Sequence, residues 1–253
     1  MGSNKMISGH ISPAQEQAFL ELHKRGLLTW LPWVGGDYKP GGLLVVGETN
    51  YAHDDSGATP DDAVANVNGN WHFTHDVVNT FCLSRRKSNR TFDVITHLLK
   101  GSDAAKVAAV SAEVWQSFAY MDLIQTAMKG KGWGNGDKRI AIERPQKAMW
   151  KPGWKALIEV IKILKPGSLL FVGAGLAYNC KGKSLPDGTE SCITNVCKVD
   201  HSLWLRAGWI KPYGENRIDI ISIPNPGGAR GFVCECWRKA VWEYGKRIIP
   251  ERK

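Results

Sequence analysis

LLVVGETNYAH, residues 43–53, joins an apolar run to a group of residues that can do chemistry. Four consecutive apolar residues open the stretch, as is typical of a strand buried on both faces of a parallel sheet. Gly47 ends the run, and the residues that follow it include Glu48, Thr49, Asn50, Tyr51 and His53. Ligands of open α/β sheets bind at the carboxyl ends of the strands. The stretch therefore predicts a buried strand that leads into a candidate site.

Other short apolar runs predict strands of the same kind. Together with GLLVVG (42–47) they are FAYMDLIQ (118–125), SLLFVG (168–173) and IDIISIP (218–224). Helical patterns lie between or after them, over residues 102–118, 150–167 and 231–247. This alternation predicts an α/β fold, a three-layer α/β/α sandwich with a mainly parallel central sheet. Residues 54–70 and 181–188 are expected to be surface loops.

The chain before the first of these strands has its own helix signals. Ser12, Pro13 and Gln15 have the spacing of a capping box with proline at the first helical position. They predict a helix that runs to about Arg25 and ends at Gly26. We therefore divide the chain into an N-terminal helical extension, residues 1–40, and a main domain, residues 41–253.

The composition is that of a globular protein with a basic surplus. Lys and Arg number 33 against 24 Asp and Glu, which gives a net charge of +9. Such a surplus indicates a polyanionic partner, nucleic acid or an anionic membrane surface, although a soluble protein can also simply be basic. The sequence contains no apolar window long enough for a transmembrane helix, and its start lacks the apolar core of a signal peptide. We expect a cytoplasmic protein without a membrane partner.

Cysteines and basic segments give weaker signals. The six cysteines include no C-x2-C pair, so free thiols are expected rather than a zinc or iron–sulfur site. KGKGWGNGDKR (129–139) and the run Arg85, Arg86, Lys87 and Arg90 either contact a phosphate backbone or form solvated surface. No phosphate loop of the Gly-x4-Gly-Lys-Ser/Thr type is present. VGAGLAY (172–178) lacks the third glycine of a dinucleotide fingerprint.

Three segments at predicted strand ends, taken in order, resemble the motifs of the uracil-DNA glycosylase superfamily. GETNY (47–51) is similar to its first motif, and NPGGAR (225–230) is similar to its second. Asp122, in the strand between them, stands where that family has an amide side chain that reads a flipped base. The resemblance covers about residues 40–245 and implies a uracil-DNA glycosylase-like fold.

The resemblance also implies a function. The protein would be a DNA glycosylase that flips a base out of DNA and hydrolyses its N-glycosidic bond, as a monomer, without metal or organic cofactor. Positive charge would develop on the sugar and negative charge on the leaving base. The implied catalytic residues are Glu48, Asn50 and Asn225. The implied substrate-binding residues are Thr49, Tyr51, Phe73 and Asp122, and the implied DNA-binding residues are Gly227, Gly228 and Arg230.

The first motif departs from the family at Thr49, where the most active members have an aspartate that activates or positions water. Threonine cannot act as a general base. Glu48 could polarise a water molecule, or it could cap backbone amides of the turn. Asn50 could hold the water through its carbonyl oxygen, or it could be a turn residue. Asn225 could donate to the leaving base or hold a water molecule, or PNPGG could be only a tight turn.

Asp122 is the departure that bears on the substrate. An asparagine can donate to O4 of uracil, whereas an ionised aspartate only accepts and suits the 4-amino group of cytosine. We therefore expect a modified cytosine as the substrate, such as a hydroxymethylated or glucosylated base of phage DNA, and a role in defence against phages. Tyr51 counts against this, because tyrosine at that place blocks substituents on carbon 5 in uracil-specific relatives. Alternatively, Asp122 is a strand-end carboxylate paired with a lysine or arginine.

Several readings remain open. Phe73 either stacks on the flipped base or packs in the core, and Trp71 and His72 are its near substitutes. The protein could be a uracil-DNA glycosylase of base excision repair, or a catalytically weak superfamily member that binds DNA. A different α/β hydrolase or nucleotide-processing enzyme is the remaining alternative.

Overall fold

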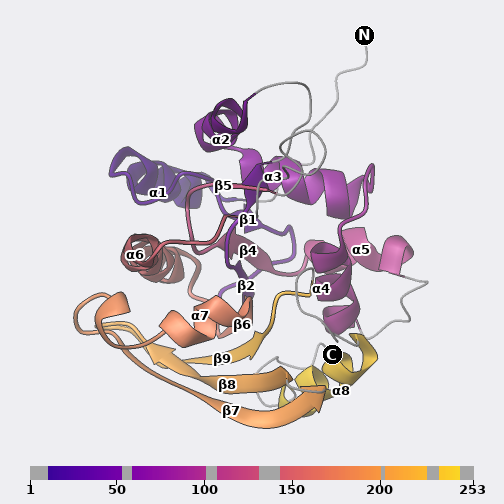
Figure 1. Ribbon diagram of the computed structural model, residues 1–253. Coiled ribbons are helices and arrows are strands. Elements are labelled where there is room, and N and C mark those ends of the chain that lie inside the picture. The colour runs from indigo at the N-terminus through magenta and orange to yellow at the C-terminus, as the bar shows by residue number, and fades with distance from the viewer. Residues whose placement is uncertain are drawn as a thin grey trace.

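The computed structural model of the protein describes residues 11–52, 59–100, 107–130, 143–200, 203–226 and 234–245. A seven-stranded sheet in the order β1-β4-β2-β6-β9-β8-β7 forms its centre (Figure 1). In that order, the strands are Trp33–Val34, Ala119–Asp122, Leu43–Gly47, Ser168–Val172, Ile218–Ile223, Leu203–Lys211 and Glu190–Asp200. A small second sheet pairs β3 (Tyr51–Ala52) with β5 (Met128–Lys129).

The four strands predicted from the sequence are β2, β4, β6 and β9, which lie side by side and run parallel. At one edge, β1 runs antiparallel to β4. At the other edge, β8 runs antiparallel to β9, and β7 antiparallel to β8. The sheet is therefore mixed, and the expectation of a mainly parallel sheet holds only for its centre. The β7–β8 hairpin, which the sequence analysis did not predict, accounts for most of the difference.

Helices cover both faces of the sheet. Successive residues of β2 point to opposite faces, as the period of two in a strand requires. Leu44 and Val46 belong to a core with helices α1 (Pro13–Lys24), α6 (Lys147–Leu164) and α7 (Ala174–Asn179). Leu43 and Val45 belong to a core with helices α4 (Arg90–Lys100), α5 (Val107–Trp115) and α8 (Cys234–Gly245). The architecture is thus α/β with a helical layer on each side of the sheet.

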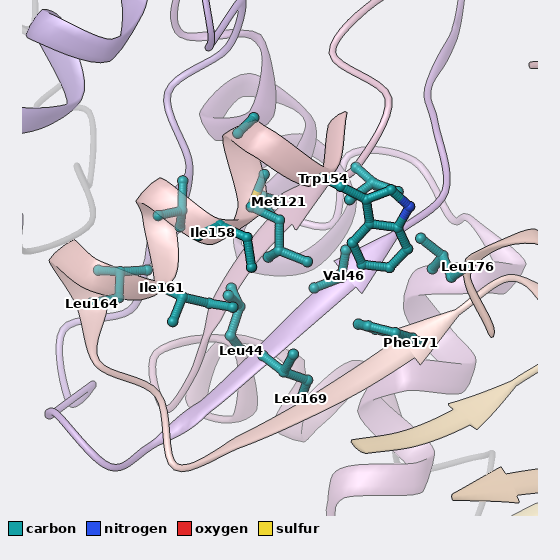
Figure 2. Packing of buried hydrophobic residues seen from close by; sticks show 14 of the residues in the cluster. Leu44, Val46, Met121, Trp154, Ile158, Ile161, Leu164, Leu169, Phe171 and Leu176 are labelled. Carbon is teal, nitrogen blue, oxygen red and sulfur yellow. The ribbon is translucent and has the colours of Figure 1, made fainter. Parts of the chain in front are cut away.

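The core on the α6 side fixes the strands that lead into the candidate site. Figure 2 shows Trp154 of α6 between Val46 of β2, Phe171 of β6 and Leu176 of α7. Trp154 is fully buried, and its ring centroid lies 5.8 Å from that of Phe171. Burying a side chain of this size contributes roughly 2–3 kcal/mol. Packing around Trp154 therefore holds α6 and α7 against β2 and β6.

The predicted N-terminal helix is confirmed. Helix α1 has Ser12 as its N-cap, Gln15 completes the capping box, and Gly26 follows the helix with a φ of +69°. Phe19 and Leu22 of α1 are buried in the same core as α6, and β1 joins the main sheet. The described part of the expected extension is therefore built into the domain.

The expected surface loop at residues 54–70 contains a helix instead. Helix α2 covers Pro60–Gly69, with Thr59 as N-cap and Asp62 completing a capping box. The sequence signal is of the same kind as that of α1, a hydroxyl residue followed by proline and, at the third helical position, a side chain that completes the capping box. Residues 181–188 contain a short 3-10 helix, Gly182–Ser184, between irregular segments. Most of the basic stretch 129–139 lies outside the described residues.

The helices and cysteines of the described part relate to two expectations for the whole chain. None of the described helices is both long and apolar enough to cross a membrane. The cysteines whose side chains are described are free thiols, as expected: Cys82, Cys180, Cys192, Cys197 and Cys236.

Helix α6 approaches the end of β4 so closely that one of its positions must be glycine. A Cβ atom on Gly153 would lie 2.5 Å from the backbone oxygen of Leu123, which directly follows β4. Gly153 is buried and follows Pro152 inside the helix. Glycine is unfavourable inside a helix by about 1 kcal/mol relative to alanine. This cost is offset by the contact with the backbone that carries the candidate site.

We predict that Gly153→Ala destabilises the protein, although alanine is the better helix former. The Cβ would push α6 away from Leu123, and such overpacking typically costs about 1–3 kcal/mol. The free energy of unfolding from urea denaturation measures this. Gly69→Ala is the matched control, because no atom of the described residues lies within 4 Å of the position of its Cβ. It should be neutral or slightly stabilising. Equal effects of the two substitutions would contradict the close approach.

Candidate functional site

A cavity of about 350 Å³ opens at the carboxyl ends of the parallel strands. The ends of β2, β4 and β6 and the segment after β9 form its base. Helix α3 (Phe73–Val78), the π-helix η1 (Asn79–Leu83) and helix α4 form its wall. From β2 the chain first adds β4 on one side of it and later β6 on the other side, so the strand order reverses at β2. Open α/β sheets bind ligands at such topological switch points. Its size is at the lower end of that of small-molecule sites.

The cavity brings together residues from all the segments singled out in the sequence. Its lining includes every described residue of the candidate site: Glu48, Thr49, Asn50, Tyr51, Phe73, Asp122 and Asn225. These residues are spread over most of the chain, from β2 to the segment after β9. Gly227, Gly228 and Arg230 lie outside the described residues, as do His53, Asp54 and Asp55. The described candidate residues thus line one cavity.

Asp122 is the polar centre of the cavity. Its side chain is 1% exposed, yet both carboxyl oxygens have donors. The Tyr120 hydroxyl donates to Oδ1 over 2.9 Å, and the Asn50 side-chain amide donates to Oδ2. Gly47 on β2 leaves the room for this arrangement. A Cβ at Gly47 would lie 2.6 Å from the Tyr120 hydroxyl oxygen and would also overlap Asp122 Oδ1.

Burial raises the pKa of Asp122 to about 7, and the hydrogen bond from Tyr120 opposes part of that rise. The carboxyl therefore changes its ionisation near neutral pH, unlike an exposed aspartate. The sequence analysis considered that Asp122 could be paired with a lysine or arginine. In the described part of the chain it forms no such ion pair, and its partners are neutral. A buried carboxyl with this environment is a candidate functional group.

Asn50 is oriented by its contact with Asp122. Since its amide nitrogen donates to the carboxyl, its carbonyl oxygen points away from Asp122. The turn after β2 is held by backbone bonds, including Met128 N–H to the Asn50 carbonyl over 2.9 Å. Asn50 is therefore both a turn residue and a cavity residue. Both alternatives considered for it are compatible with this geometry.

Glu48 connects the cavity to α7. Its Oε2 accepts a hydrogen bond of 3.1 Å from the Gly175 N–H. A Cβ on Gly175 would lie 2.6 Å from the same oxygen, and Gly173 adopts a φ of +144° beside it. Glu48 thus caps a backbone amide, as one of the two alternatives expected. Burial raises its pKa, whereas the Gly175 amide and the charge of Arg144 act in the opposite direction.

Other predicted residues have mixed structural roles. The Thr49 hydroxyl donates to the Thr126 carbonyl over 3.1 Å, which fits a positioning role and not a general base. Tyr51 is half-buried in β3, and burial together with the nearby Glu48 raises its pKa. Phe73 lines the cavity and also packs against Trp30, with ring centroids 5.3 Å apart. Trp71 and His72, its suggested substitutes, do not line the cavity.

Several cavity residues escaped the sequence analysis. Tyr120 looked like a core residue of an apolar strand, but its position two residues before Asp122 places both on one face. Phe81 of η1 stacks on Phe92 of α4, with centroids 5.7 Å apart and planes 7° apart. The π-helix brings Phe81 to the cavity, and such insertions are frequent at functional sites.

The polar rim was missed as well. Lys87, Asn89 and Thr91 lie between η1 and the first turn of α4 and line the cavity. The Thr91 hydroxyl donates to the Asn225 side-chain oxygen over 3.3 Å, which links this rim to the segment after β9. Lys87 belongs to the basic run noted in the sequence. Only the fold shows that it, unlike Arg85, Arg86 and Arg90, lines the cavity.

The described residues include no group of three or more His, Cys, Asp or Glu side chains that could hold a metal ion. Comparison of the chain with protein-family models, with curated proteins and with solved structures finds no match.

Asp122→Asn measures the cost of burying this carboxyl. The folded protein holds the proton up to about pH 7, whereas the unfolded chain releases it near the ordinary pKa of 3.8. The contribution of this group to stability is therefore complete below about pH 4 and is lost as the pH rises toward 7. Asparagine does not titrate. Relative to the wild type, the free energy of unfolding of the variant should therefore rise by up to about 1.4 kcal/mol per pH unit over that interval. Above the interval the difference should stay constant.

Urea denaturation at several pH values between about 5 and 8 provides the free energies of unfolding for this comparison. The exposed Asp187→Asn is the control, because its carboxyl lies away from the cavity. A difference between wild type and Asp122→Asn that does not change with pH would show that Asp122 is not buried in the way described.

Proposed function

We propose that the protein is a DNA glycosylase that excises a modified pyrimidine, and that its substrate is a modified cytosine. The observation that carries the proposal is the single cavity lined by Glu48, Asn50, Asp122 and Asn225. These residues come from three separate segments that were selected from the sequence for their resemblance to glycosylase motifs. Aromatic side chains beside them, including Phe73 and Phe81, suit the faces of a flipped base.

Recognition of the base would rest on Asp122. Above about pH 7 the carboxyl is ionised and only accepts, so it favours a base with an amino group at position 4. Below that pH the protonated carboxyl can donate to a carbonyl oxygen at the same position. The same side chain would therefore read cytosine derivatives when ionised and uracil when neutral. This supports uracil excision in base repair as the second candidate function, favoured at lower pH.

Bond cleavage would rest on Glu48 and Asn50. The bond between the sugar C1′ and the base nitrogen breaks, its electron pair leaves with the base, and water adds to C1′. Glu48 stabilises the positive sugar and takes the proton that the water loses as it adds to C1′. The departing base anion takes up a proton from solvent, and Glu48 then returns its own to solvent, so no proton is gained or lost overall. A raised pKa suits this role, because a general base works best when its pKa lies near the working pH. The Asn50 carbonyl oxygen would hold the water.

A panel of matched oligonucleotides tests the substrate. The strands contain uracil, cytosine, hydroxymethylcytosine or glucosylated hydroxymethylcytosine, and cleavage at the abasic site reports base release. We expect release of a modified cytosine, increasing with pH through about 7. Asp122→Asn should lose this pH dependence and shift the preference toward uracil, because an amide can donate to O4.

The panel separates the candidate functions. Release of uracil alone by the wild type would support the repair enzyme and contradict the cytosine proposal. If no base is released while DNA binding persists, the protein is a DNA-binding member without catalysis. If DNA binding is also absent, the glycosylase proposal is wrong.

Glu48→Gln tests the proposed catalytic carboxylate. The amide oxygen can still accept from Gly175 N–H, so the fold and its melting temperature should be preserved. Base release should fall by about 10²- to 10⁴-fold, as is typical when a general base is removed. Glu159→Gln on α6 is the control, because its carboxylate pairs with Lys162, 2.8 Å away, and does not line the cavity. Retention of full activity by Glu48→Gln would leave Glu48 with a purely structural role.

A further inference from the structure

Two exposed aromatic residues lie near the carboxyl edge of the sheet, outside the cavity. Tyr178 of α7 is 57% exposed, and Trp204 of β8 is 40% exposed. Neither lines the cavity described above. Together with Arg206, Lys198 and Asn195 they form a surface that we call the edge platform.

The platform residues share one face of the β7–β8 hairpin. Trp204 and Arg206 are two positions apart on β8, so their side chains point the same way. Lys198 and Asn195 of β7 are their respective cross-strand partners. Side chains of directly opposed residues lie on the same face of a sheet. Leu205, between them, points to the opposite face and is buried in the core with α8.

The guanidinium group of Arg206 lies over the Tyr178 ring. Its guanidinium carbon lies 4.1 Å from the ring centroid. One guanidinium nitrogen donates to the Tyr178 hydroxyl over 2.6 Å, and Nε donates to the Asn195 side-chain oxygen over 3.0 Å. Neither Arg206 nor Lys198 has an ion pair with a carboxylate of the described residues. The platform thus combines fixed aromatic surface with two cations that no described carboxylate neutralises.

The position of the platform relates it to the cavity. Arg206 pairs with Ser222 of β9, and continuing this antiparallel register places Trp204 at the level of Pro224. The next residue, Asn225, lines the cavity. Helix α7 begins after β6 and carries both Gly175, the partner of Glu48, and Tyr178. Helix α7 therefore contributes Tyr178 to the platform and contacts the cavity residue Glu48 through Gly175.

We propose that the edge platform binds unpaired nucleotides of a DNA single strand whose target base occupies the cavity. Exposed aromatic rings stack on the faces of bases, which are accessible only when the bases are unpaired. Arg206 adds a planar stacking group, and both cations attract the phosphate backbone. The proposal rests on the proposed function for the choice of DNA, and it adds a preference for single-stranded over duplex substrate.

Binding of DNA that contains no target base tests the platform separately from catalysis. Fluorescence anisotropy would compare a labelled, unmodified oligothymidine strand with its duplex with oligoadenosine. Trp204→Ala and Tyr178→Ala should each weaken single-strand binding by about five- to a hundredfold and leave duplex binding nearly unchanged. Arg206→Lys keeps the charge and loses the planar group, so it should also weaken single-strand binding preferentially. These side chains are exposed or half-buried, so the melting temperature should stay the same.

Tyr213→Ala is the matched control. Tyr213 is 80% exposed, more than either platform aromatic, but it follows the end of β8 at the opposite edge of the sheet. It should leave single-strand binding unchanged. An equal loss in the control, an equal loss on duplex DNA, or no loss in the platform variants would each overturn the proposal. Weaker single-strand binding by the platform variants, in a protein that releases no base, would support the platform and contradict the glycosylase proposal.

Discussion

The burial of the Asp122 carboxyl is the constraint on which the rest of the site depends. An unpaired carboxylate in a protein interior is strongly unfavourable, so the group needs donors, protonation or both. Gly47 of the neighbouring strand β2 leaves space for the carboxyl. Tyr120, on β4 with Asp122, supplies its hydroxyl, and the turn after β2 supplies the Asn50 amide. The residue types at Gly47 on β2 and at Tyr120 on β4 are therefore explained by their contacts with the Asp122 side chain. The resulting pKa of about 7 gives the cavity a group that changes its ionisation near neutral pH.

The second carboxylate of the cavity, Glu48, has a different environment. Glu48 is directed toward the start of α7, where glycines at 173 and 175 allow close approach and the Gly175 amide donates to it. The charge of Arg144 also favours its ionised form, against the effect of burial. Two carboxylates in one site thus have different partners, and distinct environments of this kind allow distinct roles in recognition and in bond cleavage. Helix α7 in turn connects Glu48 to the edge platform.

Much of the fold was predictable because its centre obeys simple patterns. Strands β2, β4, β6 and β9 are apolar runs bounded by turn residues, and α1 has a complete capping box. The β7–β8 hairpin was missed because one face of it is exposed, so that its residues do not form an apolar run. Helix α2 was missed because its apolar residues are few and none of them is buried, although its cap was readable.

The candidate site was predictable where chemistry-bearing residues directly follow strands, as at Glu48 to Tyr51, Asp122 and Asn225. The cavity residues that lie on helices packed over the strand ends were not predictable, because only the tertiary structure places them there. Phe81 lies in a π-helix, and Lys87 and Thr91 lie in or next to α4, so only the packing of these helices over the strand ends places them in the cavity. Tyr120 was hidden within an apolar strand, and its position two residues before Asp122 was the only signal.

A crystal structure of the Glu48→Gln variant with a single strand that contains hydroxymethylcytosine tests the central claim most directly. We predict that the base lies in the cavity, with its 4-amino nitrogen about 3 Å from the Asp122 carboxylate. A base bound with its amino group away from Asp122, or DNA bound with the cavity empty, would contradict it.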